Sequence, residues 1–259
     1  MSSKDSIKST LIIAFVLRLG CSILVSAAAV VLKPRQDANR VLDRNKNILS
    51  AAGLFDERQH TNADVATLFA QFTPRIVDLR AGRLLETDEV ENLGIDISSY
   101  DQRLVINDPD FVESISRELD QADIKRRVVY PMIYVMEKEG MVDTIVLPIS
   151  GYGLWGILYG FLALDGDANT VKGLAFYEMK ETPGLGAEVR NPEWRALWTG
   201  KKIYNTDGEV ALRVGLPGSG EFIVDGLSGA TLTTRGVDNL IQYWLGEEGY
   251  GPILESVSN

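Results

Sequence analysis

The feature that most constrains this chain is an apolar stretch near its N-terminus, residues 11 to 32. Its 22 residues include a single charged side chain, Arg18, and 13 of them are Leu, Ile, Val or Phe. At about 1.5 Å per residue, a helix of this length crosses the roughly 30 Å hydrocarbon core of a bilayer. The summed preference of the apolar side chains for the membrane outweighs the cost of one Arg, about 3 kcal/mol. The stretch therefore predicts one transmembrane helix over residues 11–32.

A cleaved signal peptide is the alternative for the same stretch. Lys4 and Lys8 precede it, and the alanines at 27 to 29 fit a small-x-small cleavage pattern. The apolar run continues to Leu32, beyond the usual core of about 7 to 15 residues in a signal peptide, which favours a retained helix. Positive side chains flank the stretch on both sides, so charge alone leaves its orientation open.

The composition of the 259 residues is that of a globular chain, with 45% hydrophobic and 24% charged residues. A formal net charge of −10 opposes binding to a phosphate backbone, so nucleic acid is excluded as a partner. One cysteine, Cys21, and one histidine, His60, exclude an intrachain disulfide and a metal site built from several thiolates or imidazoles. No metal site is predicted.

Helical periodicity follows the membrane stretch. Gly53 and Pro74 are the expected stops of the first two helices. The basic run 125–127 is interpreted as a solvated face. The helical stretches are predicted over residues 36–53, 65–72 and 108–119.

The pattern changes to strands in the second half of the chain. Asn191-Pro192 supplies a helix cap and a proline at the first helical position. The last helix carries an apolar stripe from Val237 to Leu245. The predicted fold class is therefore α+β: one N-terminal transmembrane helix followed by a mixed α/β domain. The strands are predicted over residues 128–136, 142–149, 154–164, 171–179 and 209–214.

Two familiar patterns are set aside. Asp165-x-Asp167-x-Asn169 resembles the start of a calcium loop, but the required Gly and Glu positions hold Thr170 and Phe176, so a plain turn is predicted. A dinucleotide fingerprint starting at Gly184 lacks its third glycine, and no helix follows immediately. We expect neither a calcium site nor a Rossmann site.

Two glycine-rich loops are candidates for ligand contact. Residues 151–156 allow the backbone to approach a flat ligand, and Tyr152 and Trp155 offer aromatic faces. Residues 181–186, with the sequence ETPGLG, predict a rigid loop whose amides can receive the carbonyls and ring nitrogens of a heterocycle. Ordinary tight turns are the alternative for both.

A third segment, residues 225–231, precedes the last helix. Small residues surround the hydroxyl of Thr231, and a helix N-terminus supplies free amides and a positive dipole end suited to phosphate. Arg235 lies one helical turn further and can add a charge-assisted contact. In the alternative interpretation, Thr233 or Thr234 caps the helix and the small residues are only its entry loop.

The sequence DGLSGAT at 225–231 resembles the acceptor motif of flavin transferases, in which the final Thr is esterified to the phosphate of FMN. The loops 151–156 and 181–186 resemble the companion motifs of the same FMN-binding family. The resemblance implies covalent FMN on Thr231. The other implied cofactor-binding residues are Trp155, Glu181, Thr182, Gly184, Leu185, Gly186, Asp225, Ser228, Gly229, Ala230 and Arg235.

The resemblance extends over nearly the whole chain. The segments 32–34, 42–49, 159–164 and 244–252 are similar to the C subunits of the sodium-translocating NADH:quinone reductases. This family implies an electron relay without catalytic residues of its own, which passes electrons from a membrane iron centre to another flavin subunit. Implied partners are the other membrane subunits, a flavin transferase and membrane lipid.

The same resemblance implies a place in the bacterial inner membrane, with the bulk of the chain in the periplasm. It divides the chain into a cytoplasmic tail (1–10), the span (11–32), a membrane-proximal region (33–130) and an FMN-binding domain (131–259).

One position departs from the family pattern. Met179 stands where family members often have a histidine shortly before ETPGLG, so no proton-transfer role is carried over to it. Two rival functions remain: the equivalent FMN subunit of the ferredoxin:NAD oxidoreductase complex, and a membrane-tethered flavin module that senses redox state.

Overall fold

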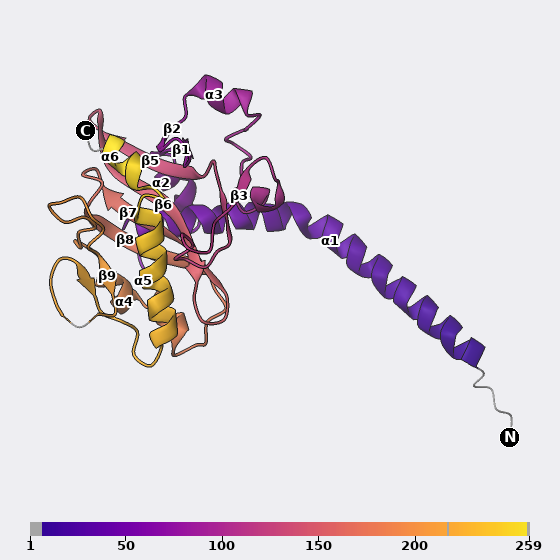
Figure 1. Ribbon diagram of the computed structural model, residues 1–259. Helices are drawn as coiled ribbons and strands as arrows, with labels where there is room; N and C mark the ends of the chain where they lie inside the picture. The colour runs from indigo at the N-terminus through magenta and orange to yellow at the C-terminus, as the bar shows by residue number, and fades with distance from the viewer. Residues whose placement is uncertain (1–6, 217, 258–259) are drawn as a thin grey trace. The chain divides into compact units, whose positions relative to one another are not determined.

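The computed structural model of the chain describes residues 7–216 and 218–257, and it divides the chain into two units, Met1–Asp43 and Arg44–Asn259 (Figure 1). Each unit is considered by itself.

The first unit is helical. Helix α1, Ile7–Ala51, begins here and continues through Pro34 without interruption. The large apolar side chains between Leu11 and Leu32 are exposed, and an 18-residue window of the helix has a mean hydropathy of 2.3. An apolar surface of this kind requires a nonaqueous environment, so the described part of α1 is a candidate membrane span, as the sequence predicts. Gly53, with φ of +72°, follows the helix as expected.

The second unit is built on a six-stranded sheet in which all neighbouring strands are antiparallel. The spatial order is β2-β1-β5-β6-β7-β8. The hairpins β1-β2, β5-β6, β6-β7 and β7-β8 join strands that are adjacent in sequence. In contrast, β1 pairs with β5 across more than 50 residues. The strands of this sheet are β1 (Phe72–Asp78), β2 (Arg83–Leu84), β5 (Met132–Lys138), β6 (Met141–Tyr152), β7 (Ile157–Asp165) and β8 (Val171–Glu178).

Helix α5, Thr231–Leu245, packs against β6 and closes the core (Figure 1). Alternate residues of β6, including Ile145 and Leu147, are buried in the same cluster as Leu240 and Ile241 of the helix. Burial of each such side chain contributes about 1.5–3 kcal/mol. The predicted apolar stripe of this helix is therefore confirmed. The smaller elements around it are α4 (Pro192–Ala196), β9 (Arg213–Val214), β10 (Ile223–Val224) and the C-terminal α6 (Gly251–Val257).

The helix start predicted at Asn191-Pro192 is confirmed. The Asn191 side chain accepts a hydrogen bond from the Glu193 amide, and Pro192 is the first helical residue. Trp194 and Trp198 are buried against the core. Of the strand predicted at 209–214, only the last two residues form a strand, β9. This strand pairs in parallel with β10 outside the main sheet.

Two helix predictions before residue 130 need correction. The short helix α2 covers Asp64–Phe69, and Pro74 is no helix stop but part of β1, whose partner β5 fixes an extended backbone there. The helix predicted from Asp108 to Leu119 is wrong. That segment forms β3, Val112–Ser114, which pairs with β4, Arg126–Val128.

A pair of opposite charges on β3 and β4 explains why the predicted helix from Asp108 to Leu119 does not form. Glu113 on β3 accepts from Arg127 Nε at 2.6 Å and also from Arg80 Nε at 2.8 Å, so a distant contact overrides the local helical pattern. The interpretation of 125–127 as a solvated face holds for Lys125 and Arg126, which are exposed, but is wrong for Arg127, whose side chain is only 10% exposed. The remaining elements of this region are α3 (Thr87–Asn92) and the 3-10 turn η1 (Val105–Asn107).

Candidate functional site

The three loops singled out in the sequence meet at the start of α5. The contacts are close enough to require glycine: a methyl group on Gly236 in α5 would collide with the carbonyl oxygen of Tyr152. A methyl group on Gly186 would collide with Thr233 of α5, and one on Gly229 would lie 3.3 Å from Leu185 Cδ2. The three loops and α5, separated by up to about 80 residues in sequence, are thus brought into close contact at these glycines.

Glu181, in the loop 181–186, forms hydrogen bonds to the loop 151–156 and to helix α5. It is 7% exposed, and its Oε1 accepts from the backbone amides of Leu154 at 2.9 Å and Trp155 at 3.0 Å. Its Oε2 accepts from the Thr233 hydroxyl of α5 at 2.6 Å. A buried carboxylate is stable in an apolar surrounding only when hydrogen bonds satisfy it. Glu181 therefore fixes the loop at 151–156 and the helix relative to its own loop.

The ETPGLG loop is held by its own backbone. The carbonyl oxygen of Thr182 accepts from the amides of Leu185 and Ala187, both at 3.1 Å. Gly184 has φ of +74°, a conformation that costs side-chain-bearing residues more than glycine. The 3-10 turn η2, Gly186–Arg190, follows directly. These bonds leave the Leu185 side chain 43% exposed beside the third loop.

The N-terminus of α5 has no side-chain cap. Ala230 occupies the cap position and Thr231 is the first helical residue, with an exposed side chain. Thr233 is engaged with Glu181, and the Thr234 hydroxyl accepts from the Leu227 amide at 2.9 Å. The alternative in which Thr233 or Thr234 caps the helix is therefore wrong. The first amides of α5 keep the capacity to bind an anion.

Large apolar side chains on the three loops are exposed. Trp155 is 62% exposed and Leu232, next to Thr231, is 51% exposed. Tyr152, Leu154 and Leu185 are each about 40% exposed. Together they form an apolar surface next to the uncapped helix end, a combination that suits a flat ring joined to a phosphate.

The predicted site residues fall into two groups. Three of them are buried and support the loops; the others are exposed and available to a ligand. The buried residues are Glu181, Gly186 and Ala230. The exposed residues are Trp155, Thr182, Gly184, Leu185, Asp225, Ser228, Gly229, Thr231 and Arg235.

Sequence reasoning missed two supporting residues. Thr233 binds Glu181 across 52 positions, and only the fold could have revealed this pairing. Trp194 donates from Nε1 to the carbonyl oxygen of Asp225 at 2.8 Å, which anchors the start of the third loop. Its place in a predicted helix indicated burial but gave no partner.

The two patterns set aside in the sequence are turns. Asp167 Oδ1 accepts from the amides of Asn169 and Thr170, at 2.9 and 2.7 Å. Burial raises the pKa of Asp167, but hydrogen bonds from Thr170 and Asn169 outweigh it and lower the pKa to about 2. Among residues 7–216 and 218–257, no group of three or more His, Cys, Asp or Glu side chains is placed to hold a metal ion.

Comparisons with known proteins agree with this geometry. Residues 153–246, which contain all three loops in large part, match the family described as FMN-binding domain. Two relatives named as C subunits of Na(+)-translocating NADH-quinone reductases cover nearly the whole chain. The one from Haemophilus ducreyi is 44% identical over 97% of this chain and 95% of its own length, and the one from Pseudomonas aeruginosa is 43% identical over 99% and 98%.

Solved structures show the same fold. The crystal structure of NqrC from Shewanella oneidensis has a TM-score of 0.72 at 29% identity, covering 83% of this chain and 96% of its own. The crystal structure of the corresponding reductase subunit from Parabacteroides distasonis has a TM-score of 0.64 at 26% identity, covering 86% and 96%.

Proposed function

Because the chain belongs to the family of C subunits of the Na(+)-translocating NADH-quinone reductases, we propose that it carries FMN esterified to Thr231 and relays electrons within such a complex. FMN binding itself follows from the FMN-binding domain at 153–246. The attachment residue and the electron path are the proposed part. The observation that carries the proposal is the exposed Thr231 hydroxyl at an uncapped helix end, beside the apolar loops.

The helix end suits the phosphate of FMN. A phosphodiester at Thr231 keeps one negative charge, and the free amides and dipole of α5 stabilise an anion there by about 0.3–1 kcal/mol. Arg235 is exposed one turn further along the helix and is available for a charge-assisted contact. A flavin transferase would form the bond, since no residue of the three loops is placed as its catalyst.

The isoalloxazine ring would lie against the exposed side chains of the loops. Trp155 and Leu185 supply apolar contact, and Thr182, Gly184, Ser228 and Gly229 supply polar groups or a close backbone approach. Asp225 stands at the edge of this surface, whereas Glu181, Gly186 and Ala230 support it from below. The bound flavin supplies the electron transfer, and the protein holds and orients it. Glu181 is occupied by three hydrogen-bond donors, which leaves Asp225 as the one exposed carboxylate of the three loops, and this scarcity of acid and base groups favours a relay.

The position of the domain completes the proposal. Helix α1 would span the bacterial inner membrane over residues 11–32, with residues 1–10 in the cytoplasm. The membrane-proximal region 33–130 and the FMN-binding domain 131–259 would lie in the periplasm, next to the other membrane subunits. The match covers 95% or more of the length of each of the two reductase subunits. This coverage favours a subunit of the same reductase over the ferredoxin-dependent complex and over a free-standing sensory module.

A denaturing gel tests the attachment. When the chain is expressed with its flavin transferase, we expect a flavin-fluorescent band, and a peptide containing Thr231 with the added mass of FMN less water. Thr231→Ala should abolish both signals. Thr67→Ala, which removes an exposed hydroxyl outside the three loops, is the control and should keep the covalent band. Fluorescence that persists in Thr231→Ala would place the bond elsewhere.

A further inference from the structure

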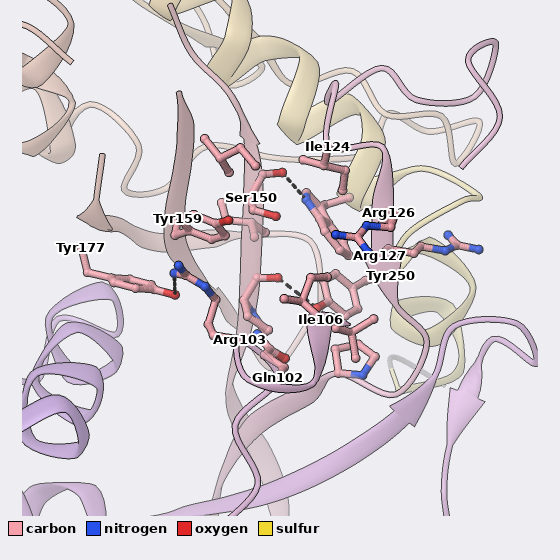
Figure 2. A pocket seen from close by; sticks show the side chains of 16 residues that line it. Gln102, Arg103, Ile106, Ile124, Arg126, Arg127, Ser150, Tyr159, Tyr177 and Tyr250 are labelled. Carbon is pink, nitrogen blue, oxygen red and sulfur yellow. Dashed lines mark hydrogen bonds between the residues drawn. The ribbon is translucent and has the colours of Figure 1, made fainter. Parts of the chain in front are cut away.

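A cavity borders the loop at 151–156 without including any residue of the three flavin loops (Figure 2). It encloses about 250 Å³ and is bordered by β6, β7 and β8 together with the segments around residues 102–106 and 124–131. None of its sixteen lining residues belongs to 151–156, 181–186 or 225–231. The flavin proposal therefore does not account for it.

The charge of the lining is unusual for this chain. Three of the sixteen lining residues are arginines, Arg103, Arg126 and Arg127, and none is Asp or Glu. The whole sequence has 36 acidic against 26 basic residues, so a lining chosen at random would include more acidic than basic side chains. A cavity with only positive charges in an acidic protein favours an anion.

The three guanidinium groups differ in their surroundings. Arg103 forms a pair of hydrogen bonds to Glu178, both at 3.2 Å, and lies over the Tyr159 ring at 3.4 Å from its centroid. It also donates to the Tyr177 hydroxyl (Figure 2). Arg127 is paired with Glu113 at 2.6 Å. In the part of the chain that the structure describes, no salt bridge to Arg126 is found. Arg126 thus contributes the charge that the surrounding carboxylates do not neutralise.

The walls of the cavity are aromatic and aliphatic. Trp244 stacks on Tyr250 with ring centroids 5.2 Å apart, and each polar tip is already bound: Trp244 Nε1 donates to Ser150 O, and the Tyr250 hydroxyl donates to Pro148 O. Both residues are buried, with exposed fractions of 6% for Trp244 and 0% for Tyr250, so they form the base of the cavity. The half-buried side chains of Ile106, Ile157 and Tyr159 supply the carbon surface that remains open to a ligand. A volume of about 250 Å³ is at the small end of ligand pockets, with room for one or two fused rings.

We propose that this cavity binds a small planar aromatic carboxylate, with its ring between the apolar walls and its carboxylate at Arg126. The half-buried apolar side chains favour a ring, and the exposed guanidinium of Arg126, to which the described part of the chain forms no salt bridge, favours a single negative charge. The site is distinct from the flavin attachment, because none of its residues lies in the three loops, although Ser150 and Ile157 border the first of them.

Isothermal titration of the full-length chain in a nonionic detergent tests the proposal, with 1-naphthoate as the probe and detergent alone as the blank. We expect saturable binding, and weaker binding of the neutral 1-naphthalenemethanol. Arg126→Gln should reduce the affinity for naphthoate by about fivefold or more, since it removes a charge-assisted contact. Ile106→Trp, which fills the cavity and keeps every charge, should also reduce it.

Arg117→Gln is the matched control, because Arg117 is exposed but does not line the cavity. Its affinity for naphthoate should equal that of the unmodified chain. The proposal is overturned if the unmodified chain shows no saturable binding, if the neutral alcohol binds as well as naphthoate, or if Arg126→Gln and Arg117→Gln behave alike.

Discussion

At the scale of single residues, the site depends on a carboxylate that points inward. The resemblance groups Glu181 with the residues that hold FMN, yet its two oxygens are taken by Leu154, Trp155 and Thr233. We infer that it acts on the flavin by positioning the loops that contact it. Among the described residues no salt bridge to Glu181 is found, and three hydrogen-bond donors replace the water that burial removes from its oxygens.

Substitution of Glu181 should therefore separate loop position from flavin contact. Glu181→Ala leaves two amides and one hydroxyl without an acceptor, and we expect a loss of about 2–4 kcal/mol in unfolding free energy and poor flavin incorporation. Glu181→Gln keeps the shape and one acceptor, so the loss should be about 1 kcal/mol. Thermal unfolding and flavin content of the purified chain measure both. Equal stability of Glu181→Ala and the unmodified chain would contradict the positioning role.

The sequence predicts the exposed residues of the site better than its supports. Thr231, Trp155 and Leu185 belong to short motifs that the sequence reveals, and all three are exposed. Thr233 gives no such signal, because its partner is 52 positions away and the pairing exists only in the folded chain.

At the scale of elements, the pattern of apolar residues predicts a helix or strand correctly where the element is stabilised by contacts close in sequence. The hairpins β5-β6-β7-β8 and helix α5 match the prediction, since continuous apolar runs between turn residues describe the strands and an apolar stripe describes the helix. The predicted helix from Asp108 to Leu119 fails because Glu113 binds two arginines from other segments. Glycines at 236 and 186 permit the close approach of α5, which no periodicity reveals.

The Glu113 cluster should make the β3-β4 segment sensitive to acid. Burial raises the pKa of Glu113, but hydrogen bonds from Arg80 and Arg127 outweigh it and hold the pKa below its usual 4.5. A lowered pKa means that the carboxylate stabilises the fold fully above about pH 4.5, and that this contribution is lost as the pH falls through the lowered value.

Glu113→Gln should accordingly lower the melting temperature most at pH 6 to 7, by the equivalent of about 1–3 kcal/mol, and progressively less below pH 4.5. Melting curves of the purified chain across this range measure the difference. Glu118→Gln, at an exposed position nearby, is the control and should show little effect. A Glu113→Gln effect that is constant with pH would contradict the assignment.

At the scale of the whole molecule, one apolar helix and one flavin-binding domain are joined in a single chain. The length of the apolar stretch is enough to predict the helix, because bilayer thickness sets it. The flanking charges are not enough to orient it, since Lys and Arg lie on both sides. Family membership supplies the setting in which the domain acts.

Protease accessibility tests the orientation. In spheroplasts, added protease should digest the domain after residue 33, while a cytoplasmic marker protein stays intact. The mature chain should retain residues 11–32, as measured by the mass of its N-terminal peptide. A protected domain, or an N-terminus near Ala29, would contradict the proposed topology.

The central claim is that electrons pass through the flavin on Thr231, and the assembled reductase carrying Thr231→Ala tests it most directly. Both NADH oxidation by an artificial acceptor and NADH-dependent quinone reduction are measured on the same preparation. We expect the first activity to stay at the level of the unmodified complex and the second to fall to the background of the assay, because the relay is interrupted after NADH oxidation. Quinone reduction at the unmodified rate would show that this flavin lies off the electron path.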